Sequence, residues 1–437
     1  MSHGPDLSRA IARVPHGMPM KLIVWCSGVL FAGIFGAHWV YAQWPERAMV
    51  DFLQNTVFWM GVSQGGFMLA VALTLTKGRW GRALKRIAES FAIMMPVLYI
   101  GLLTFLLIGG IEVFPWVEEA RNHTLPAHKA VYLTEPFFIV RQVVGIGLLI
   151  WLDWKYIQAS WRPDLGKMAE QLGDDAPGWY GYFTKGWKGL EAEIEASEVA
   201  QRKWGAIVAI AYSLVFSVVS VDLSMSLAPH WFANMFPAWF FMSSMWSGMV
   251  AIGLFSLLAG RWLHINYLLT PSLYHDLGKL IFAFCMFWGY TTYAQYLAIW
   301  YGNMTEETGF ILLRTQLDPW AGLSKVVVMV CFFMPWTLLL SRSMKKIRSS
   351  FLAVSALIFV GIWLERFVVM VPSIWKGSEL PIGMGEILMP LGFGATMVLL
   401  VCWVLSKIPA TPVTDKMFAP NDLEVHVHPS HGHHAAK

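Results

Sequence analysis

The chain of 437 residues is 56% hydrophobic and only 14% charged, and its formal net charge at pH 7 is +4. With a mean hydropathy of +0.52 it lies outside the composition of soluble globular proteins, so the sequence indicates an integral membrane protein. The small positive charge gives no reason to expect a nucleic-acid partner, because basic residues ordinarily flank membrane spans.

Ten segments are long and apolar enough to cross roughly 30 Å of hydrocarbon, which takes about 20 helical residues. In chain order these segments are 22–43, 52–75, 90–111, 133–154, 204–226, 238–260, 276–300, 321–341, 351–371 and 383–406. No small-residue cleavage pattern follows the first segment, so we expect it to remain a span rather than to be removed as a signal peptide. The predicted fold class is an all-α integral membrane protein with about ten transmembrane helices.

The spans divide the chain into five predicted parts. These are a cytoplasmic N-terminal segment (1–20), four spans (21–154), a cytoplasmic loop with an interfacial helix (155–203), six spans (204–406) and a disordered, His-rich cytoplasmic tail (407–437). The loop ends in GWKGLEAEIEASEVAQRKW, which alternates apolar and charged residues as a surface helix does. The tail contains HVHPSHGHH, whose histidines are also compatible with metal binding, although a disordered tail is the interpretation we adopt.

Basic residues predict the orientation, because cytoplasmic loops are enriched in Lys and Arg. They gather after the second and eighth spans, at Lys77, Arg79, Arg82, Lys85 and Arg86 and at Arg342, Lys345, Lys346 and Arg348. The intervening loops are poor in basic residues and carry acids with interfacial Trp and Tyr, so we expect them to be periplasmic. Both termini are then cytoplasmic.

The four cysteines all fall within apolar runs and form no CxxC or CxxCH motif; they are Cys26, Cys285, Cys331 and Cys402. Disulfides, covalently attached haem and iron–sulfur ligation are therefore not expected. We predict no catalytic residue, metal site or redox cofactor in this chain.

Ionised side chains cost roughly 2.5 to 3.5 kcal/mol at the centre of a span, so each one is a candidate for function. In the cytoplasmic half they are Glu89, Asp153, His264, His275, Asp276 and Lys279. The last three open the seventh span, where Asp276 and Lys279 have the i,i+3 spacing of a helix pair. The alternative is a helix end anchored at the interface, since most of these residues lie within a turn of a span end.

Charged residues of the periplasmic half lie deeper. They are Glu135, Arg141, Asp222, Lys325, Glu365 and Arg366. Arg141 lies about 9 Å inside the fourth span at 1.5 Å per residue, so it needs a partner. Adjacent helical residues point apart, so we expect Glu365 and Arg366 to pair with other helices. These depths predict a buried cluster of mixed charge; structural ion pairs between helices are the alternative.

A proton moving between the two halves needs hydrogen-bonding side chains near the midplane. The candidates are Gln64 on the second span and Tyr290, Thr291, Thr292 and Gln295 on the seventh. Hydroxyls and amides in spans also commonly bond a neighbouring helix, which is the alternative interpretation. The predicted proton route runs from the polar start of the seventh span through these side chains to the outer charged cluster.

Four segments carry the most specific pattern. They are LKRIAESFA (84–92), HKAVYLTEPFFIVRQ (128–142), VDLSMSLAPHWFANMF (221–236) and LHINYLLTPSLYHDLGKLIFAFCMFWGYTTYAQYLAIWYGNMTEET (263–308). Together they resemble the ActF-type membrane subunits of bacterial alternative complex III, which belong to the NrfD-like (polysulfide reductase membrane subunit) family. The resemblance extends from the second to the eighth predicted span and leaves out the first span, the long loop and the tail.

The resemblance implies ten helices in two four-helix bundles with flanking spans, in the bacterial cytoplasmic (inner) membrane. It implies a membrane subunit of a quinol:cytochrome c (or other acceptor) oxidoreductase that supports quinol oxidation and proton translocation. Menaquinol or ubiquinol would bind in the complex, with haem c and iron–sulfur clusters in partner subunits. Those partners would be a homologous NrfD-like membrane subunit, a periplasmic iron–sulfur subunit, cytochrome c subunits and a terminal oxidase or soluble electron acceptor.

Asp222 and His230 are the residues that we expect to bind a quinone, because a carboxylate or histidine in the outer half would accept its proton. In the alternative interpretation, SLAPHWFANMF is an aromatic turn at the membrane interface in which His230 caps a helix.

Three other functions stay open at this point. They are an NrfD-type anchor of another periplasmic iron–sulfur or molybdenum reductase, a secondary transporter, and a structural scaffold. Many transporters carry matched, Gly- or Pro-interrupted spans in both halves. Pro96 and Pro335 are isolated within their spans, so no matched pair is evident.

Overall fold

The computed structural model describes residues 17–125 and 127–418. These residues form helices, turns and loops, with no strand among them. The first 16 residues of the predicted N-terminal segment and the histidine-rich part of the predicted tail, 419–437, lie outside the described residues.

Nine helical stretches within the described residues are long and apolar enough to cross a membrane. They are Met20–Gln43 (α1), Pro45–Leu75 (α2), Arg82–Leu107 (η2, α3, η3 and α4), Glu135–Asp175 (α7 and η5), Leu190–Leu227 (α9 and η6), Phe236–Trp262 (α10), Trp320–Leu340 (α13, η7 and α14), Arg348–Ser373 (α16 and η8) and Met384–Leu405 (α17). Each corresponds to one predicted span, and the class of all-α membrane protein is confirmed.

The remaining predicted span forms α11 (Pro271–Gly302), whose 32 residues are long enough to cross a bilayer. It is missing from the nine apolar helices because the polar residues Tyr290, Thr291, Thr292, Tyr293 and Gln295 dilute its hydropathy. Its start is fixed by Thr270, whose hydroxyl oxygen accepts a hydrogen bond from the Leu273 backbone N–H at 3.3 Å. The tenth span stays a prediction.

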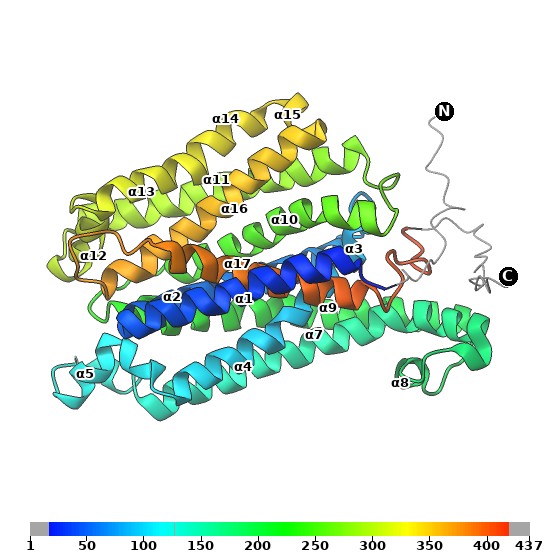
Figure 1. Ribbon diagram of the computed structural model, residues 1–437, viewed down its shortest axis with the longest axis horizontal. Helices are drawn as coiled ribbons and strands as arrows, with labels where there is room; N and C mark the ends of the chain where they lie inside the picture. The colour runs from blue at the N-terminus through cyan, green and yellow to red at the C-terminus, as the bar shows by residue number, and fades with distance from the viewer. Residues whose placement is uncertain (1–16, 126, 419–437) are drawn as a thin grey trace.

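Short helices mark the two ends of the long ones (Figure 1). At one end lie α5 (Pro115–Arg121) and α12 (Thr305–Thr315), and at the other lie α3 (Lys85–Ser90), α8 (Tyr180–Thr184) and α15 (Arg342–Lys346). We call these the outer end and the inner end, after their predicted sides. The two basic loops predicted to be cytoplasmic therefore share one end of the molecule.

The predicted cytoplasmic loop 155–203 is mostly helical extension of two spans. α7 continues without a break to Leu172, and α9 already begins at Leu190. The segment expected to lie on the membrane as an interfacial helix, 186–204, is therefore mainly the first part of α9. One charged residue of this segment contacts α7, since Arg162 donates to Glu193 at 2.6 and 2.8 Å. The interfacial position of the segment stays a prediction.

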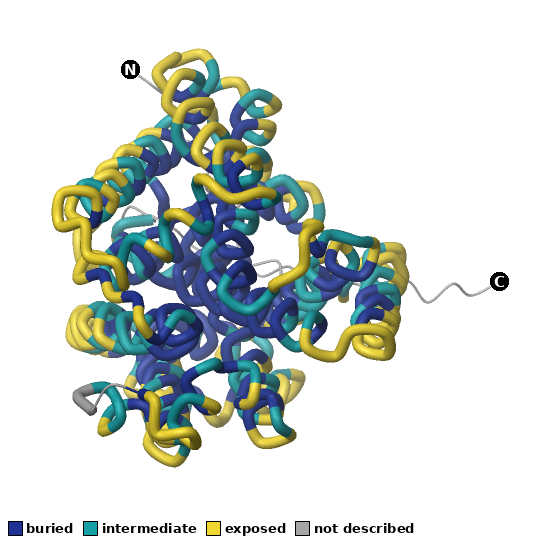
Figure 2. The backbone as a smooth tube through the Cα atoms, turned by 90° about the vertical axis from the view of Figure 1, so that its left-hand side faces the viewer, coloured by how far each residue is buried: buried dark blue, intermediate teal, exposed yellow. Residues whose placement is uncertain are grey.

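Helix α2 lies at the centre of the molecule, and 94% of its most apolar window is buried. It packs against α1, α4, α9, α10, α16 and α17. The end-on view shows this buried centre surrounded by more exposed helices (Figure 2). Since α2 has protein on nearly every side, its polar side chains face neighbouring helices rather than lipid.

Small residues allow α2 and α10 to touch backbone to backbone. A Cβ atom at Gly65 would lie 2.0 Å from the Ser244 carbonyl oxygen, and one at Gly248 would lie 2.0 Å from the Gly66 backbone nitrogen. Glycine at such crossings lets helices approach closely inside a bilayer, where packing drives their association.

We predict that Gly248→Ala separates α2 from α10 and lowers the free energy of unfolding by about 1–3 kcal/mol, the usual cost of overpacking. Thermal unfolding of the detergent-solubilised protein measures the effect. Gly28→Ala on α1 is the matched control, because a Cβ there meets nothing within 4 Å. Equal stability of the two variants would contradict the close crossing.

Candidate functional site

A buried ionic cluster at the inner end is built around Arg86 of α3. This guanidinium is 1% exposed and donates to Glu89 at 2.5 Å, to the Ser160 hydroxyl and carbonyl oxygens at 3.1 and 3.0 Å, and to Asp164. The Ser160 hydroxyl and the Trp161 indole N–H also donate hydrogen bonds to Glu89, at 2.5 and 2.9 Å. Two carboxylates and one arginine thus join α3 to α7.

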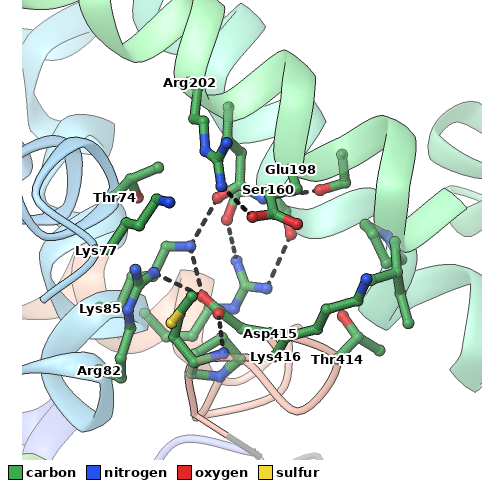
Figure 3. Close-up of a pocket in the computed structure, with 17 residues that line it drawn as sticks. Thr74, Lys77, Arg82, Lys85, Ser160, Glu198, Arg202, Thr414, Asp415 and Lys416 are labelled. Atoms are coloured by element: carbon green, nitrogen blue, oxygen red, sulfur yellow. Dashed lines mark hydrogen bonds and ion pairs between the residues drawn. The ribbon is translucent and has the colours of Figure 1, made fainter. Parts of the chain in front are cut away.

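The chain beyond α17 returns to this cluster (Figure 3). Asp415 accepts hydrogen bonds from Arg82 at 2.7 Å and from Lys85 at 3.1 Å, while the Thr414 hydroxyl donates to Asp164 at 2.6 Å. Residues 407–418 were predicted to belong to a disordered tail, and for these residues the prediction is wrong. The reason is electrostatic: Asp415 supplies the negative charge that two buried cations need.

Burial by itself would raise the pKa of Asp415, but Lys85 and then Arg82 outweigh burial and hold that pKa below its ordinary value. A group with a lowered pKa stabilises the folded state at neutral pH and loses this contribution as the pH falls through its folded-state pKa. The contact between residues 407–418 and the inner end is therefore stable near neutrality and weakens in strong acid.

A cavity of about 50 Å³ adjoins the Arg86 cluster and Asp415. This volume holds a few water molecules. Its charged lining residues are Lys77, Arg82, Lys85, Arg86, Glu198, Arg202, Asp415 and Lys416. Ser160 lines this cavity, and its hydroxyl donates a hydrogen bond to Glu89. The cavity therefore gives water a route to Ser160.

One carboxyl group lies deeper along α7 and is incompletely paired. Asp153 is 3% exposed, and its Oδ1 accepts a hydrogen bond from the Gln64 amide at 3.0 Å. Its Oδ2 and the Gln64 carbonyl oxygen have no hydrogen-bond partner among the described residues. Between Asp153 and the inner cluster, the hydroxyls of Tyr156 and Thr74 lie 2.6 Å apart.

The outer charged site joins α7 to the end of α9. Arg141 forms a bidentate pair with Asp222, at 2.9 and 3.0 Å, and Gln142 donates to the same carboxylate at 2.7 Å. The guanidinium also lies 3.8 Å from the centre of the Tyr132 ring. Along α7, Asp153 lies eleven residues after Gln142 and eleven residues before Asp164. Each separation corresponds to about 16 Å of helix.

Glu365 and Arg366 of α16 are fully buried and bind each other, with 2.5 Å between Arg366 Nη1 and Glu365 Oε1. We expected them to pair with other helices, which they do, but the bond between the two neighbours was not predicted; it forms because an arginine side chain is long enough to fold back on the adjacent residue. Each also reaches another helix: Arg366 donates to Ser243 at 2.5 Å, and Trp288 donates to Glu365 at 3.3 Å. The pair ties α16 to α10 and α11.

Glu135 and Lys325 of the predicted outer cluster and the predicted quinone ligand His230 take no part in the Arg141–Asp222 pair. Glu135 is at the outer surface, 3.1 Å from Arg121, and Lys325 is exposed. His230 is also half-exposed and lies 3.3 Å from Glu119.

The predicted inner entrance on α11 is a surface feature. Lys279 donates to Asp276 at 2.8 Å, and His275 lies 3.9 Å from the same carboxylate. Further along α11, Gln295 donates to the Thr291 carbonyl oxygen of its own helix at 3.2 Å, and Tyr290 is exposed. These bonds close within α11, so they do not link it to Gln64, which instead binds Asp153 of α7.

Sequence reasoning missed two polar sites. Asp51 on α2 and Glu386 on α17 lie together at the outer end with Arg47, and Arg314 of α12 donates to the carbonyl oxygens of Val368 and Val369. The sequence signal for the first site was one acid at the start of each of two spans. These acids, Asp51 and Glu386, are 335 residues apart, and nothing in the sequence indicates that they meet.

No protein-family model and no curated protein sequence matches the chain. The resemblance to alternative complex III subunits therefore stays a prediction.

We predict that Arg141→Gln lowers the free energy of unfolding by about 3–5 kcal/mol, because it leaves the Asp222 carboxylate buried without its counter-charge. Asp222→Asn has a comparable effect, and the double variant loses much less than the sum of the two. Denaturant unfolding in detergent gives the coupling energy. Additive losses would show that the pair contributes no interaction energy.

We predict that Asp415→Asn releases residues 407–418 from the inner end at neutral pH. Backbone amides of this segment then exchange with deuterium faster than those of the wild type at the same pH. In strong acid the wild-type segment loses protection too, once exchange is corrected for its slower intrinsic rate there. Asp174→Asn, at an exposed acid of the α7–α8 turn, is the control and leaves the exchange unchanged. Unaltered exchange in Asp415→Asn would contradict the electrostatic anchor.

Proposed function

We propose that this chain is the membrane subunit of a bacterial quinol:cytochrome c (or other acceptor) oxidoreductase of the alternative complex III type, and that it conducts protons for that complex. The four resembling segments support the assignment to this class. Buried, incompletely paired Asp153 is the observation that supports proton conduction.

We further propose that the helices group into two four-helix bundles. One consists of α2, α3–α4, α7 and α9, and the other of α10, α11, α13–α14 and α16, with α1 and α17 at the flank. The packing of α7 on α9, of α2 on α4 and α9, of α10 on α11 and α16, and of α1 on α17 supports this grouping. The proposed location is the bacterial inner membrane, with the inner end facing the cytoplasm.

Asp153 suits proton transfer because burial of a carboxylate without a counter-charge is costly. Its partner Gln64 is neutral, so it donates one hydrogen bond without compensating a charge. A proton on the unpaired oxygen relieves this cost, and the carboxyl group then alternates between holding and passing a proton. This is the behaviour required of a relay residue.

The inner half of the route follows α7. Water in the inner cavity reaches Ser160 and Glu89, and the hydroxyl pair of Tyr156 and Thr74 lies between them and Asp153. We propose this order in place of an entrance on α11, since Lys279 and Gln295 bond within α11 and Thr292 accepts a hydrogen bond from Trp239 of α10, so none of them leads to Gln64.

The outer half begins about 16 Å further along α7, at Gln142 and the Arg141–Asp222 pair. Buried Ile146 and Leu149 lie on the intervening stretch of α7. Proton transfer across this apolar stretch requires water to enter or α7 to move. The complex can therefore control proton transfer by controlling either change.

Any quinone in this subunit is proposed to bind at the outer end near Asp222 and His230. There Asp222 is held by Arg141 and Gln142, and half-exposed His230 is positioned by Glu119. Electrons would pass through the haem c and iron–sulfur clusters of the partner subunits.

The deciding experiment compares Asp153→Asn with Asp276→Asn in the purified complex, reconstituted into vesicles and supplied with quinol and cytochrome c. We expect Asp153→Asn to slow proton release on the order of 10²-fold, the usual loss for a positioned proton-transfer group. Asp276 is the matched control because it is a half-exposed aspartate paired with Lys279. Unchanged proton release in Asp153→Asn would overturn the proposal, whereas loss of quinol oxidation as well would show that turnover depends on this proton.

A further inference from the structure

A second cavity lies at the outer end, between the start of α2, the end of α16 with η8, and the start of α17. It has room for about 20 Å³ of water, which is enough for one molecule. Its wall combines apolar Phe367, Val371 and Trp375 with charged Arg47, Asp51 and Glu386. The proposed proton route along α7 uses none of these residues.

The charges of this cavity do not balance. Arg47 forms an ion pair with Glu386, and its guanidinium lies 5.2 Å from the Trp44 ring and 5.7 Å from the Trp375 ring. Glu386 also accepts the Gly383 backbone N–H at 2.9 Å, which caps the start of α17. Arg47 therefore compensates the charge of only one of the two buried carboxylates, that of Glu386.

Asp51 is the uncompensated carboxyl group. It is 2% exposed, and its Oδ1 accepts a hydrogen bond from the Asn55 amide at 2.9 Å. The Trp363 indole N–H donates to the Asn55 side-chain oxygen at 2.9 Å, which fixes the Asn55 amide with its NH₂ toward Asp51. Asp51 Oδ2 has no hydrogen-bond partner within the part of the chain that the structure describes.

We propose that Asp51 is a proton-binding site that opens to the outer aqueous phase, with its proton on Oδ2. Exchange is a simple transfer: the carboxyl O–H bond breaks, a water molecule in the cavity takes the proton, and the carboxylate remains until another proton returns. With the proton bound, Asp51, Arg47 and Glu386 reduce to the neutral Arg47–Glu386 pair, and the remaining charged lining residue, Glu46, is exposed.

The surroundings determine when the proton leaves. The titratable and charged groups that line the cavity are Glu46 and Arg47 of α2 and Glu386 of α17, while α16 and η8 contribute only apolar side chains. Glu386 opposes ionisation of Asp51 and Arg47 favours it, so loss of the Arg47–Glu386 pair would alter the proton affinity of Asp51. The role of Asp51 as the group that releases protons outside rests on the proposed function; its protonation does not.

Infrared difference spectroscopy of the purified, full-length protein tests the proposal directly. A protonated carboxyl group gives a C=O stretching band that is separate from carboxylate bands and shifts in deuterated water. We expect Asp51→Asn to remove one such component from the spectrum at neutral pH. Asp153→Asn is the control, and it retains this component. An unchanged spectrum in Asp51→Asn would show that Asp51 is ionised and would overturn the proposal.

A conservative variant keeps the test decisive if Asp51→Asn does not fold. In wild-type protein labelled with ¹³C at aspartate carboxyls, the C=O band of Asp51 shifts with the label. In labelled Asp51→Glu, the carboxyl group at position 51 carries no label, so its band does not shift. Retention of every label-sensitive component in Asp51→Glu would overturn the proposal. Since neither measurement requires quinol turnover, failure here is distinguishable from failure of the proton route through Asp153.

Discussion

Every ionised group inside this helical bundle must find its counter-charge within the protein, because hydrocarbon offers no solvation. Arg86 with Glu89 and Asp164, Arg141 with Asp222, and Arg366 with Glu365 all meet this requirement. The Arg86–Asp164 and Arg141–Asp222 pairs connect separate helices, and Arg366 and Glu365 reach α10 and α11 through Ser243 and Trp288. The inner cluster also anchors the chain after α17. The arrangement of the helices depends on satisfying these charges.

Two carboxyl groups break this rule, and both have one oxygen without a partner in the described part of the chain. Asp153 has a neutral amide as its partner, and Asp51 lies beside an arginine already paired with Glu386. Asp51 lines the cavity at the outer end, and the hydroxyl pair of Tyr156 and Thr74 lies between Asp153 and the inner end. Unbalanced carboxyls of this kind are costly for stability alone, which is why we assign them to proton binding.

Helix α2 links these features. It contributes Asp51 at the outer end, Gln64 beside Asp153, and Thr74 beside Tyr156. Its glycines permit the close crossing with α10, and this packing buries the polar side chains of α2 away from lipid. A single central helix therefore lies beside both proposed proton sites.

The sequence by itself determined the all-α membrane class, nine of the predicted spans and the common end of the two basic loops, because hydropathy and charge act locally along the chain. It also indicated that Arg141 needs a partner. Only the tertiary structure decided that the partner is Asp222, that Glu365 and Arg366 bind each other, and that Asp415 folds back to Arg82 and Lys85. It also brought Asp51 beside Glu386 and Gln64 beside Asp153. Such pairings depend on how helices rotate and cross, which side-chain packing sets and single-span patterns do not encode.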